Sequence, residues 1–331
     1  MQSAERIVWL RDSFAVLQVP EAVEILRLAG LTPKRELASE DAPHVAAIIV
    51  GLGKFGVEDA RPFPILLTVA RFGAGADNVD AKALWAARRI RVSSTIDLAT
   101  RDVAEFALGS IIMALRGAAR DAKALGGNPQ TWRVIDRTPA LCDATVGIIG
   151  AGNIGIETAR IVAQLASKVL VWNRSDKPLE LSGFPEGRIE RVSSTSEMAR
   201  RADVVSLHLA LGEETRGLIG KTFFDEVRRA GRSIALVNTA RGEIVDETEL
   251  LVALNDGVVH DAAIDVWSAE GVRSSEIVST LRAHPRVMAT SHIGSHTDGV
   301  LTRYAMQCVR NVVALVEGRS DDIARYVVRA D

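Results

Sequence analysis

The chain has 331 residues, of which 47% are hydrophobic and 25% are charged, and its formal net charge is −2 at pH 7. This length predicts two globular domains with large cores, and the near-neutral charge predicts no nucleic-acid partner and no attraction to an anionic membrane. The sequence has no apolar run of the ~20 residues that a membrane span needs, no signal-peptide pattern, and only two cysteines, so we expect no membrane association and a location in the reducing cytoplasm.

The first hundred residues alternate strand and helix patterns. Residues 20–30 have Pro at the start and Gly at the end of an apolar repeat, which predicts a helix, and residues 83–89 predict a second helix. Short β-type runs predict strands at residues 6–10, 46–50, 64–70 and 89–95. Alternating strands and helices indicate right-handed crossovers and a parallel sheet.

A second alternating series follows a long, Ala-rich helical pattern at residues 103–125. Its predicted strands lie at residues 145–149, 168–172, 204–209, 234–238, 262–266 and 287–291. Residues 301–318 return to helical periodicity. The fold class that we expect is therefore α/β, with two doubly wound parallel-sheet domains.

Two glycine loops, GLGKFG at residues 51–56 and GAGNIG at residues 150–155, have the G-x-G-x-x-G pattern of dinucleotide-binding sites. The pattern also needs a preceding strand, a helix that opens on the third glycine, and a second strand that ends near the ribose. The second loop has all three features, so we predict cofactor contacts there. The residues concerned are Gly150, Gly152, Asn153, Ile154 and Gly155.

The first glycine loop lacks this context. Pro62 and Pro64 limit any helix after it to about two turns. The next strand delivers Arg71-Phe72-Gly73 rather than an acid that could bind a ribose. We interpret Gly51 and Gly53 as a turn at a strand end.

The residues that end the second strand of the later series indicate the cofactor. NAD-preferring sites usually have Asp or Glu at this position, whereas this chain has Asn173, followed by Arg174 and Ser175. Without the carboxylate, a 2′-phosphate meets no repulsion, and a guanidinium beside a hydroxyl can bind it. We predict a preference for NADP(H), with NAD(H) possible and an exposed turn with a coincidental Arg as the alternative.

Polar residues follow three strands of the later series. Arg241 comes just after the run IALVN, Asp265 ends the next strand with Glu270 five residues later, and His292 follows the last strand. Together with GAGNIG, this ordered series resembles the D-isomer-specific 2-hydroxyacid dehydrogenase family, in particular its glyoxylate/hydroxypyruvate reductase-like branch. The resemblance extends over nearly the whole chain. It includes RFGAGADNVD (71–80), VAEFALGSIIMALR (103–116) and VVSLHLALGEETRGLIG (204–220).

The resemblance implies a domain organisation and further cofactor contacts. It implies a Rossmann coenzyme domain at 102–296, inserted in a flavodoxin-like substrate domain at 1–101 and 297–331, and a homodimer formed through the coenzyme domain. On this basis GLGKFG lies on the rim of the cleft between the domains, with Leu52, Lys54 and Phe55 as its candidate substrate contacts. The further residues implied to bind the cofactor are Thr95, Thr239, Ala240, Arg241, Asp265, His292 and Gly294.

The catalytic roles implied by the resemblance agree with the chemistry of reducing a 2-oxo acid. Arg241 would bind the substrate carboxylate and carbonyl as a bidentate guanidinium. His292 would be the acid/base, because imidazole titrates near neutrality, and Glu270 would orient it and favour its protonated form. Backbone N–H groups at Ala74 and Gly75 would hold the carboxylate.

Several alternatives stay open. The family usually has Pro after the position of Glu270, where this chain has Gly271, and it usually has Pro-Leu where Ala210-Leu211 stands. Gly51-Leu52 replaces the Arg-Ser typical of phosphoglycerate-oxidising members, which disfavours an NAD-dependent D-3-phosphoglycerate dehydrogenase. A non-catalytic member that resembles the family's NAD(H)-sensing co-repressors is another class, and the formate dehydrogenase branch is disfavoured because it has Gln where Glu270 stands. His292 and His296 lie one helical turn apart but have no acid or cysteine ligands nearby, so we predict no metal site.

Overall fold

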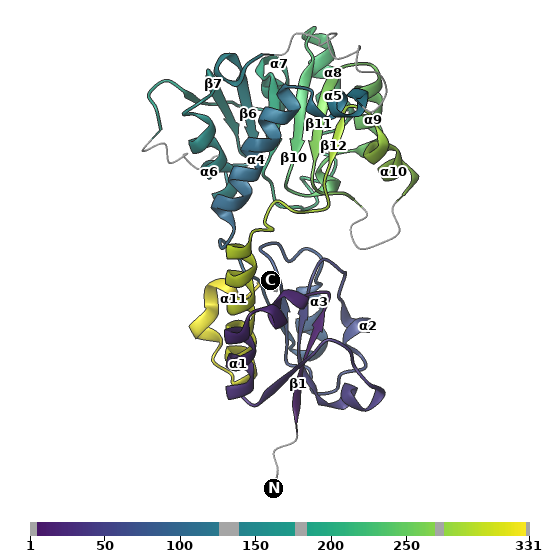
Figure 1. Cartoon of the computed structure of the whole chain (residues 1–331), viewed down its shortest axis with the longest axis vertical. Coiled ribbons are helices and arrows are strands. Elements are labelled where there is room, and N and C mark those ends of the chain that lie inside the picture. Colours follow the sequence, from purple (N-terminus) through teal and green to yellow (C-terminus); the bar gives the residue numbers. More distant parts are fainter. Residues whose placement is uncertain (1–4, 126–138, 176–183, 269–274, 329–331) are drawn as a thin grey trace. The chain divides into compact units, whose positions relative to one another are not determined.

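The computed structural model of the chain describes residues 5–125, 139–175, 184–268 and 275–328. The chain divides into two compact units, one of Met1–Ala99 with His296–Asp331 and one of Thr100–Ser295 (Figure 1).

The first unit has a five-stranded sheet in the order β2-β1-β3-β4-β5, in which every pair of neighbours is parallel. This is the flavodoxin-like order, so the predicted fold class of this unit is confirmed. β2 was not predicted from the sequence, because its residues LTPK include a proline and no apolar alternation; it lies at the sheet edge, where proline is tolerated. The strands are β1 (Arg6–Arg11), β2 (Leu31–Lys34), β3 (Val45–Val50), β4 (Thr68–Arg71) and β5 (Arg91–Ser93).

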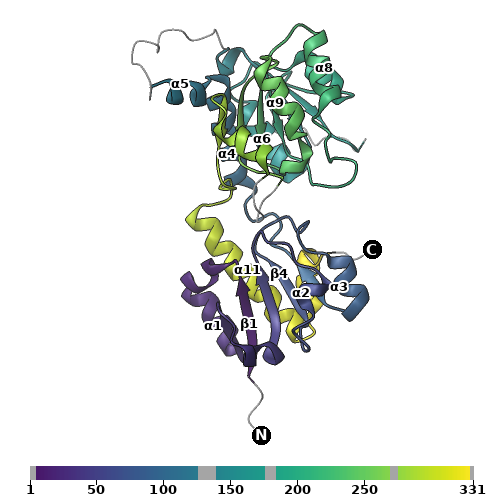
Figure 2. The same ribbon diagram turned by 90° about the vertical axis from the view of Figure 1, so that its right-hand side faces the viewer.

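Helices cover both faces of this sheet. The helices α1 (Pro20–Leu28) and α11 (Asp298–Val316) lie side by side on one face, with α2 (Val57–Ala60) and α3 (Ala81–Arg88) on the other (Figures 1 and 2). β3 is buried along its entire length, as expected for a parallel strand covered on both faces. The 3₁₀ helices are η1 (Phe14–Gln18), η2 (Ser39–His44) and η5 (Ser320–Tyr326).

The second unit has a seven-stranded sheet in the order β12-β11-β10-β9-β6-β7-β8, again with parallel neighbours throughout. With β6 as the first strand, this is the Rossmann order with one strand added at the end, and the predicted fold class is confirmed here too. The short strand β8 was missed because its residues IER are mostly charged. The strands are β6 (Thr145–Ile149), β7 (Lys168–Trp172), β8 (Ile189–Arg191), β9 (Val204–Leu207), β10 (Ile234–Asn238), β11 (Val259–Ile264) and β12 (Val287–Ala289).

Two layers of core enclose this sheet. α4 (Thr100–Leu115) and α6 (Asn153–Val162) pack on one face, and the helices α7 to α10 pack on the other. The remaining elements of the unit are α5 (Ala118–Leu125), η3 (Leu141–Asp143), α7 (Thr195–Arg201), α8 (Lys221–Arg229), η4 (Gly242–Ile244), α9 (Glu247–Asn255) and α10 (Glu276–Ala283).

The single long helix that we predicted at residues 103–125 is wrong. The structure has two helices, α4 and α5, separated at Gly117, whose φ is +62°. Only glycine adopts this left-handed conformation at low cost, which ends α4. A Cβ atom at Gly117 would also lie 2.6 Å from the guanidinium of Arg120 and 3.1 Å from the carboxylate of Asp261.

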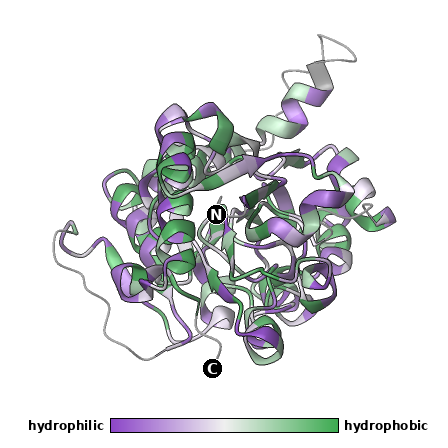
Figure 3. Ribbon diagram, turned by 90° about the horizontal axis from the view of Figure 1, so that it is seen from below, coloured by the Kyte–Doolittle hydropathy of each residue, from purple (hydrophilic) through white to green (hydrophobic). Residues whose placement is uncertain are grey.

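Hydropathy follows the packing. The helices carry hydrophobic residues on one side and hydrophilic residues on the other (Figure 3), as expected for helices with one buried face. No helix within the described ranges is long and apolar enough to cross a membrane.

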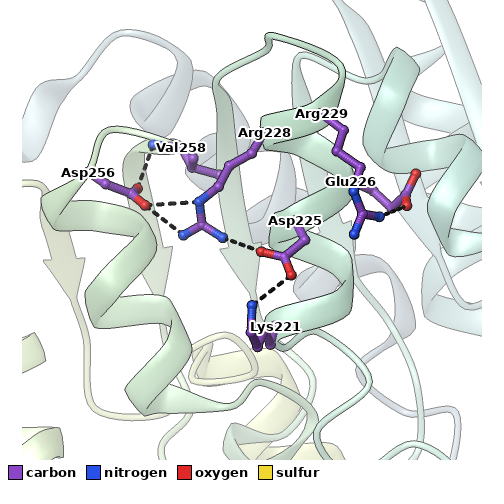
Figure 4. Close-up of polar contacts among 7 residues, drawn as sticks. All are labelled: Lys221, Asp225, Glu226, Arg228, Arg229, Asp256 and Val258. Carbon is purple, nitrogen blue, oxygen red and sulfur yellow. Dashed lines mark hydrogen bonds and ion pairs between the residues drawn. The ribbon is translucent and has the colours of Figure 1, made fainter.

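A chain of ion pairs connects α8 to the turn that precedes β11 (Figure 4). The carboxylate of Asp225 pairs with Lys221 at 2.7 Å and with Arg228 at 2.8 Å, and Arg228 also pairs with Asp256 at 2.6 Å. Asp256 accepts a further hydrogen bond from the backbone N–H of Val258 at 3.1 Å. Each of these solvated ion pairs contributes little to the stability of the fold by itself. Together they connect α8 to the segment that leads into β11.

Candidate active site

The second glycine loop connects β6 to α6 and is packed tightly at two of its three glycines. Gly150 has a φ of +108°, and a Cβ atom there would lie 2.5 Å from the carbonyl oxygen of His208. A Cβ atom at Gly155 would lie 1.9 Å from the carbonyl oxygen of Gly150. At Gly152, by contrast, a Cβ atom would meet nothing within 4 Å. Two glycines therefore serve packing, and the middle one leaves space beside the backbone.

This space lies at the N-terminus of α6, which begins at Asn153 and continues through Ile154. Gly152 is the N-cap residue and offers no side chain to the first N–H groups of the helix. Such N–H groups and the helix dipole favour an anion. The hydroxyl of Thr239 is buried and has no hydrogen-bond partner among the described residues. The open glycine, the uncapped helix and this donor fit a dinucleotide.

His208 lies directly behind the glycine loop, with its Cβ atom 3.1 Å from the Cβ position of Gly155. Burial lowers the pKa of its imidazole to about 3, so the ring is neutral at physiological pH. Its Nε2 atom lies 2.9 Å from the hydroxyl of Ser206. We assign His208 a packing role, because its neutral ring is buried against the glycine loop.

The side chain of Asn173 joins the end of β7 to the glycine loop. Its Oδ1 atom accepts a hydrogen bond from the backbone N–H of Ala151 at 3.2 Å, and its Nδ2 atom donates to the hydroxyl of Ser175 at 2.8 Å. The amide therefore donates at one end and accepts at the other, which a carboxylate could not do.

Two charged residues that contact this strand end, Glu214 and Arg191, were not found from the sequence. Arg174 is exposed and pairs with Glu214 at 2.6 Å, and Arg191, the last residue of β8, donates to the carbonyl of Ser175 at 2.9 Å. Glu214 and Arg191 are 40 and 16 residues away from their partners. No local sequence signal connects residues so far apart.

The sheet brings three predicted residues to one edge. β10, β11 and β12 are neighbouring parallel strands (Figure 1), and Arg241, Asp265 and His292 each follow the carboxyl end of one of them. A chain of hydrogen bonds connects these ends. The side chain of Asn238 donates to the Arg241 carbonyl at 2.9 Å, and the N–H of Asp265 donates to the Asn238 carbonyl at 3.0 Å. The N–H of His292 donates to the Asp265 carbonyl at 2.8 Å.

The carboxylate of Asp265 organises the loop that carries His292. It is 2% exposed and accepts hydrogen bonds from the Thr290 hydroxyl at 2.6 Å and from the backbone N–H groups of Ile293 and Gly294, both at 2.9 Å. His292 lies between these donors with a φ of +59°. A residue other than glycine needs surrounding contacts to hold this conformation, and the Asp265 bonds supply them.

The loop of Arg241 is equally constrained. The guanidinium of Arg241 donates to the Ala240 carbonyl at 2.7 Å, and a Cβ atom at Gly242 would lie 2.1 Å from the carbonyl carbon of Trp267. Ser268 is anchored to Glu247 through its N–H and its hydroxyl. Glu270 lies outside the described residues, so its pairing with His292 stays a prediction.

The other predicted residues lie in the first unit. Ala74 and Gly75 are partly buried in the loop after β4, and Leu52 is 37% exposed in the loop after β3. Thr95 follows β5, where its N–H donates to the Gly73 carbonyl at 3.0 Å. Its buried hydroxyl has no hydrogen-bond partner in the part of the chain that the structure describes. Within the same part of the chain, no group of three or more His, Cys, Asp or Glu side chains could hold a metal ion.

Comparison with known proteins decides the family. Residues 108–294, more than half of the chain, match the family described as "D-isomer specific 2-hydroxyacid dehydrogenase, NAD binding domain". The chain belongs to the D-isomer-specific 2-hydroxyacid dehydrogenase family. The resemblance seen in the sequence is therefore confirmed, and the protein is an NAD(P)-dependent oxidoreductase.

Relatives in the D-2-hydroxyacid dehydrogenase family cover most of the chain. The protein is 36% identical to 4-methyl-2-oxopentanoate reductase A of Aspergillus oryzae, over 80% of this chain and 77% of that one. It is 32% identical to a glyoxylate reductase of Aeropyrum pernix, over 77% of this chain and 75% of that one.

Solved structures agree with the fold. A glyoxylate reductase from Paecilomyes thermophila superposes with a TM-score of 0.77 at 26% identity, covering 95% of this chain and 96% of that one. A D-lactate dehydrogenase from Aquifex aeolicus, crystallised with NAD and lactic acid, has a TM-score of 0.82 at 23% identity, covering 98% of this chain and 99% of that one. The latter likeness concerns the fold alone.

The different surroundings of Gly152 and Gly155 lead to a matched pair of predictions. Gly155→Ala should lower the melting temperature by several degrees, because its Cβ atom would overlap the backbone of Gly150. Gly152→Ala should keep the melting temperature but weaken dinucleotide binding about tenfold or more, because the added methyl group occupies the open space. Thermal unfolding and fluorescence titration with NADPH and NADH measure both effects. Equal melting temperatures for the two variants would contradict this account of the loop.

Proposed function

We propose that this protein is an NADP(H)-preferring 2-oxoacid reductase of the glyoxylate/hydroxypyruvate type, which forms a D-2-hydroxy acid. The observation that carries the proposal is the hydrogen-bonded row of Arg241, Asp265 and His292 at the carboxyl ends of neighbouring strands. The glycine loop after β6 opens at the same edge of this parallel sheet. Ligands of doubly wound folds bind at this edge.

The relatives support the substrate class. One is named for the reduction of 4-methyl-2-oxopentanoate and others for the reduction of glyoxylate or hydroxypyruvate, and all of these substrates are small 2-oxo acids. In our proposal, Leu52 provides an apolar contact for the substituent of the 2-oxo acid. Backbone N–H groups of Ala74 and Gly75 bind its carboxylate.

The residues of the strand ends would divide the work of reduction. Arg241 binds the carboxylate and polarises the carbonyl, since a guanidinium stays charged and can donate two parallel hydrogen bonds. His292 donates a proton from its imidazole to the carbonyl oxygen, and Glu270 orients that ring. The bound nicotinamide cofactor supplies the hydride. Asp265 keeps His292 in place through the loop and lies on the nicotinamide side of the site.

The cofactor preference that we propose rests on the end of β7. Asn173 places no carboxylate beside the ribose, and both ends of its amide are used in contacts that hold Ser175 and the glycine loop. Arg174 is exposed beside them and can pair with a 2′-phosphate if that phosphate displaces Glu214. NADH can bind the same site without this contact. Cells usually keep their NADP pool reduced, so we propose reduction as the physiological direction.

Two further expectations from the sequence belong to this proposal. The protein is a homodimer formed through its coenzyme-binding unit, and it acts in the cytoplasm. The cytoplasmic location rests on cysteine usage, and the dimer rests on the family resemblance.

Turnover tests the proposed reaction directly. The purified protein, mixed with NADPH and a panel of small 2-oxo acids, should consume NADPH with at least one of them, as followed by loss of nicotinamide absorbance. NADH should support a lower kcat/KM. Absence of turnover with every 2-oxo acid and both cofactors would overturn the proposed function, and faster turnover with NADH would overturn the cofactor preference alone.

His292→Asn tests the acid/base role. Asparagine tolerates a positive φ, so the loop that Asp265 holds should keep its conformation. We expect kcat to fall by about 10²-fold or more, with a much smaller change in NADPH affinity, because proton transfer is the main loss. His296→Asn, which alters an exposed histidine four residues away, is the matched control and should keep kcat. A loss of NADPH affinity in His292→Asn in place of the loss of kcat would show that this residue was assigned the wrong role.

Charge changes at the end of β7 test the cofactor preference. Arg174→Gln should lower kcat/KM with NADPH by about tenfold and leave the value with NADH nearly unchanged, because only the 2′-phosphate loses a charge-assisted bond. Glu214→Gln should raise kcat/KM with NADPH, since Arg174 no longer has a competing partner. Steady-state kinetics with both cofactors measure these effects. Equal losses with NADPH and NADH in Arg174→Gln would argue against a 2′-phosphate site.

A further inference from the structure

Two loops of the first unit carry the residues that we assign to the substrate. The loop after β3, residues 51–56, carries Leu52, and the loop after β4, residues 72–79, carries Ala74 and Gly75. In the proposed function, one loop contacts the substituent of the substrate and the other its carboxylate. The spacing of the two loops then limits the length of substituent that the site accepts.

One side chain bridges these loops. The Nδ2 atom of Asn78 donates hydrogen bonds to the carbonyl of Gly51 at 3.0 Å and to the carbonyl of Gly53 at 2.7 Å. These two carbonyls flank Leu52 on both sides in the chain. Both hydrogens of the amide are therefore used to hold the backbone on either side of a single apolar residue.

The amide of Asn78 is itself oriented. Its Oδ1 atom lies 3.5 Å from Nε of Arg71, a buried residue whose guanidinium also donates to the Phe72 carbonyl. A guanidinium only donates hydrogen bonds, so the Asn78 oxygen faces Arg71, and the Asn78 NH₂ group faces the carbonyls of Gly51 and Gly53. The backbone adds a second connection, because the N–H of Phe55 donates to the Asn78 carbonyl at 2.9 Å.

The loop also lies close to Asp12, the residue after β1. A Cβ atom at Gly51 would lie 2.4 Å from the Asp12 carbonyl oxygen, and one at Gly53 would lie 2.8 Å from its carboxylate. The glycines allow the loop to approach Asp12 closely. Asp12 and Asn78 thus both contact the backbone that flanks Leu52, while the Leu52 side chain stays 37% exposed and available for contact.

We propose that Asn78 is a positioning residue that determines which 2-oxo acids the enzyme prefers, by holding Leu52 at a fixed place relative to Ala74 and Gly75. This inference rests on the proposed function. Asn78 does not contact the reacting atoms, and it affects the substrate preference only through the position of Leu52. Without the amide, the loop can adjust to substituents of different length, and the preference weakens.

Asn78→Ala tests the inference, with kcat/KM measured for 2-oxo acids from glyoxylate to 4-methyl-2-oxopentanoate. For the two substrates whose kcat/KM values differ most in the native protein, the ratio of these values should move toward one by about fivefold or more. This is a part of the roughly 10–200-fold discrimination that one apolar group can provide. The change should lie mainly in KM, and NADPH affinity should be unchanged. A native protein that turns over these acids without separating them, or an unchanged ratio in the variant, would overturn the inference.

Asp80→Ala is the matched control for local stability. Asp80 lies two residues from Asn78 and caps α3 by accepting a hydrogen bond from the Ala83 N–H at 3.0 Å, but its side chain makes no contact with residues 51–56 among the described hydrogen bonds. We expect it to lower the melting temperature and keep the substrate ratio. If Asp80→Ala changes the ratio as much as Asn78→Ala does, a general loss of stability explains both, and the inference fails.

A double-mutant cycle shows whether the effect passes through Leu52. Leu52→Ala alone should also move the substrate ratio toward one, and the double variant should change it no further, because both substitutions remove the same constraint. Additive effects would overturn the proposed route. Should Asn78→Ala fail to fold, Asn78→Asp keeps the size of the side chain, and its carboxylate cannot donate to the two carbonyls.

Hydrogen exchange tests the premise without any substrate. Amides of residues 51–56 should exchange faster in the folded Asn78 variant than in the native protein, with the amides of β10 unchanged. Unaltered exchange in residues 51–56 would overturn the inference. Failure of native turnover with every 2-oxo acid would instead remove the proposed function, while this result on the loop would stand.

Discussion

The buried carboxylate of Asp265 is the constraint on which the candidate active site depends. An acid that is 2% exposed needs donors for its oxygens, and here it finds them in the hydroxyl of Thr290 and the N–H groups of Ile293 and Gly294. These bonds force the chain after β12 into a tight loop, in which His292 has a positive φ. These hydrogen bonds offset the free energy that is needed to bury the carboxylate and to hold one residue at a positive φ. They also fix the loop in a single conformation. A proton donor needs such a fixed place.

Polar side chains hold loops at strand ends elsewhere in the protein as well. Asn238 joins β10 to the Arg241 loop, Asn173 joins β7 to the glycine loop, and Asn78 joins the loop after β4 to the loop after β3. Each of these three amides holds the backbone of a loop at the carboxyl end of a strand. Loops at the carboxyl ends of parallel strands lie outside the packed layers, so side-chain amides replace apolar packing there.

The two glycine loops show that the residues around a glycine motif distinguish a nucleotide site from a tight turn. Gly150 and Gly155 are required because their Cβ positions are filled by backbone atoms, while the Cβ position of Gly152 is open. In GLGKFG, Gly51 and Gly53 approach Asp12 closely while the Cβ position of Gly56 is open, and the α2 that follows is only four residues long. Both loops satisfy the same sequence pattern, but only the second opens a helix long enough to present its N-terminus to a phosphate.

The sequence by itself determined the α/β class, most strands and the family. Apolar runs of four to six residues, glycine punctuation and the order of the motifs are local signals that need no knowledge of packing. It failed for β2 and β8, whose polar residues are tolerated at sheet edges, and for the break at Gly117, where a positive φ ends a helix that composition alone would continue. Only the tertiary structure decided the partners of the polar groups: Asp265 with residues 290–294, Arg174 with Glu214, and Asn78 with Gly51 and Gly53. These contacts join segments that lie 25 to 40 residues apart, and they depend on the angles at which loops leave the sheet, which no local pattern encodes.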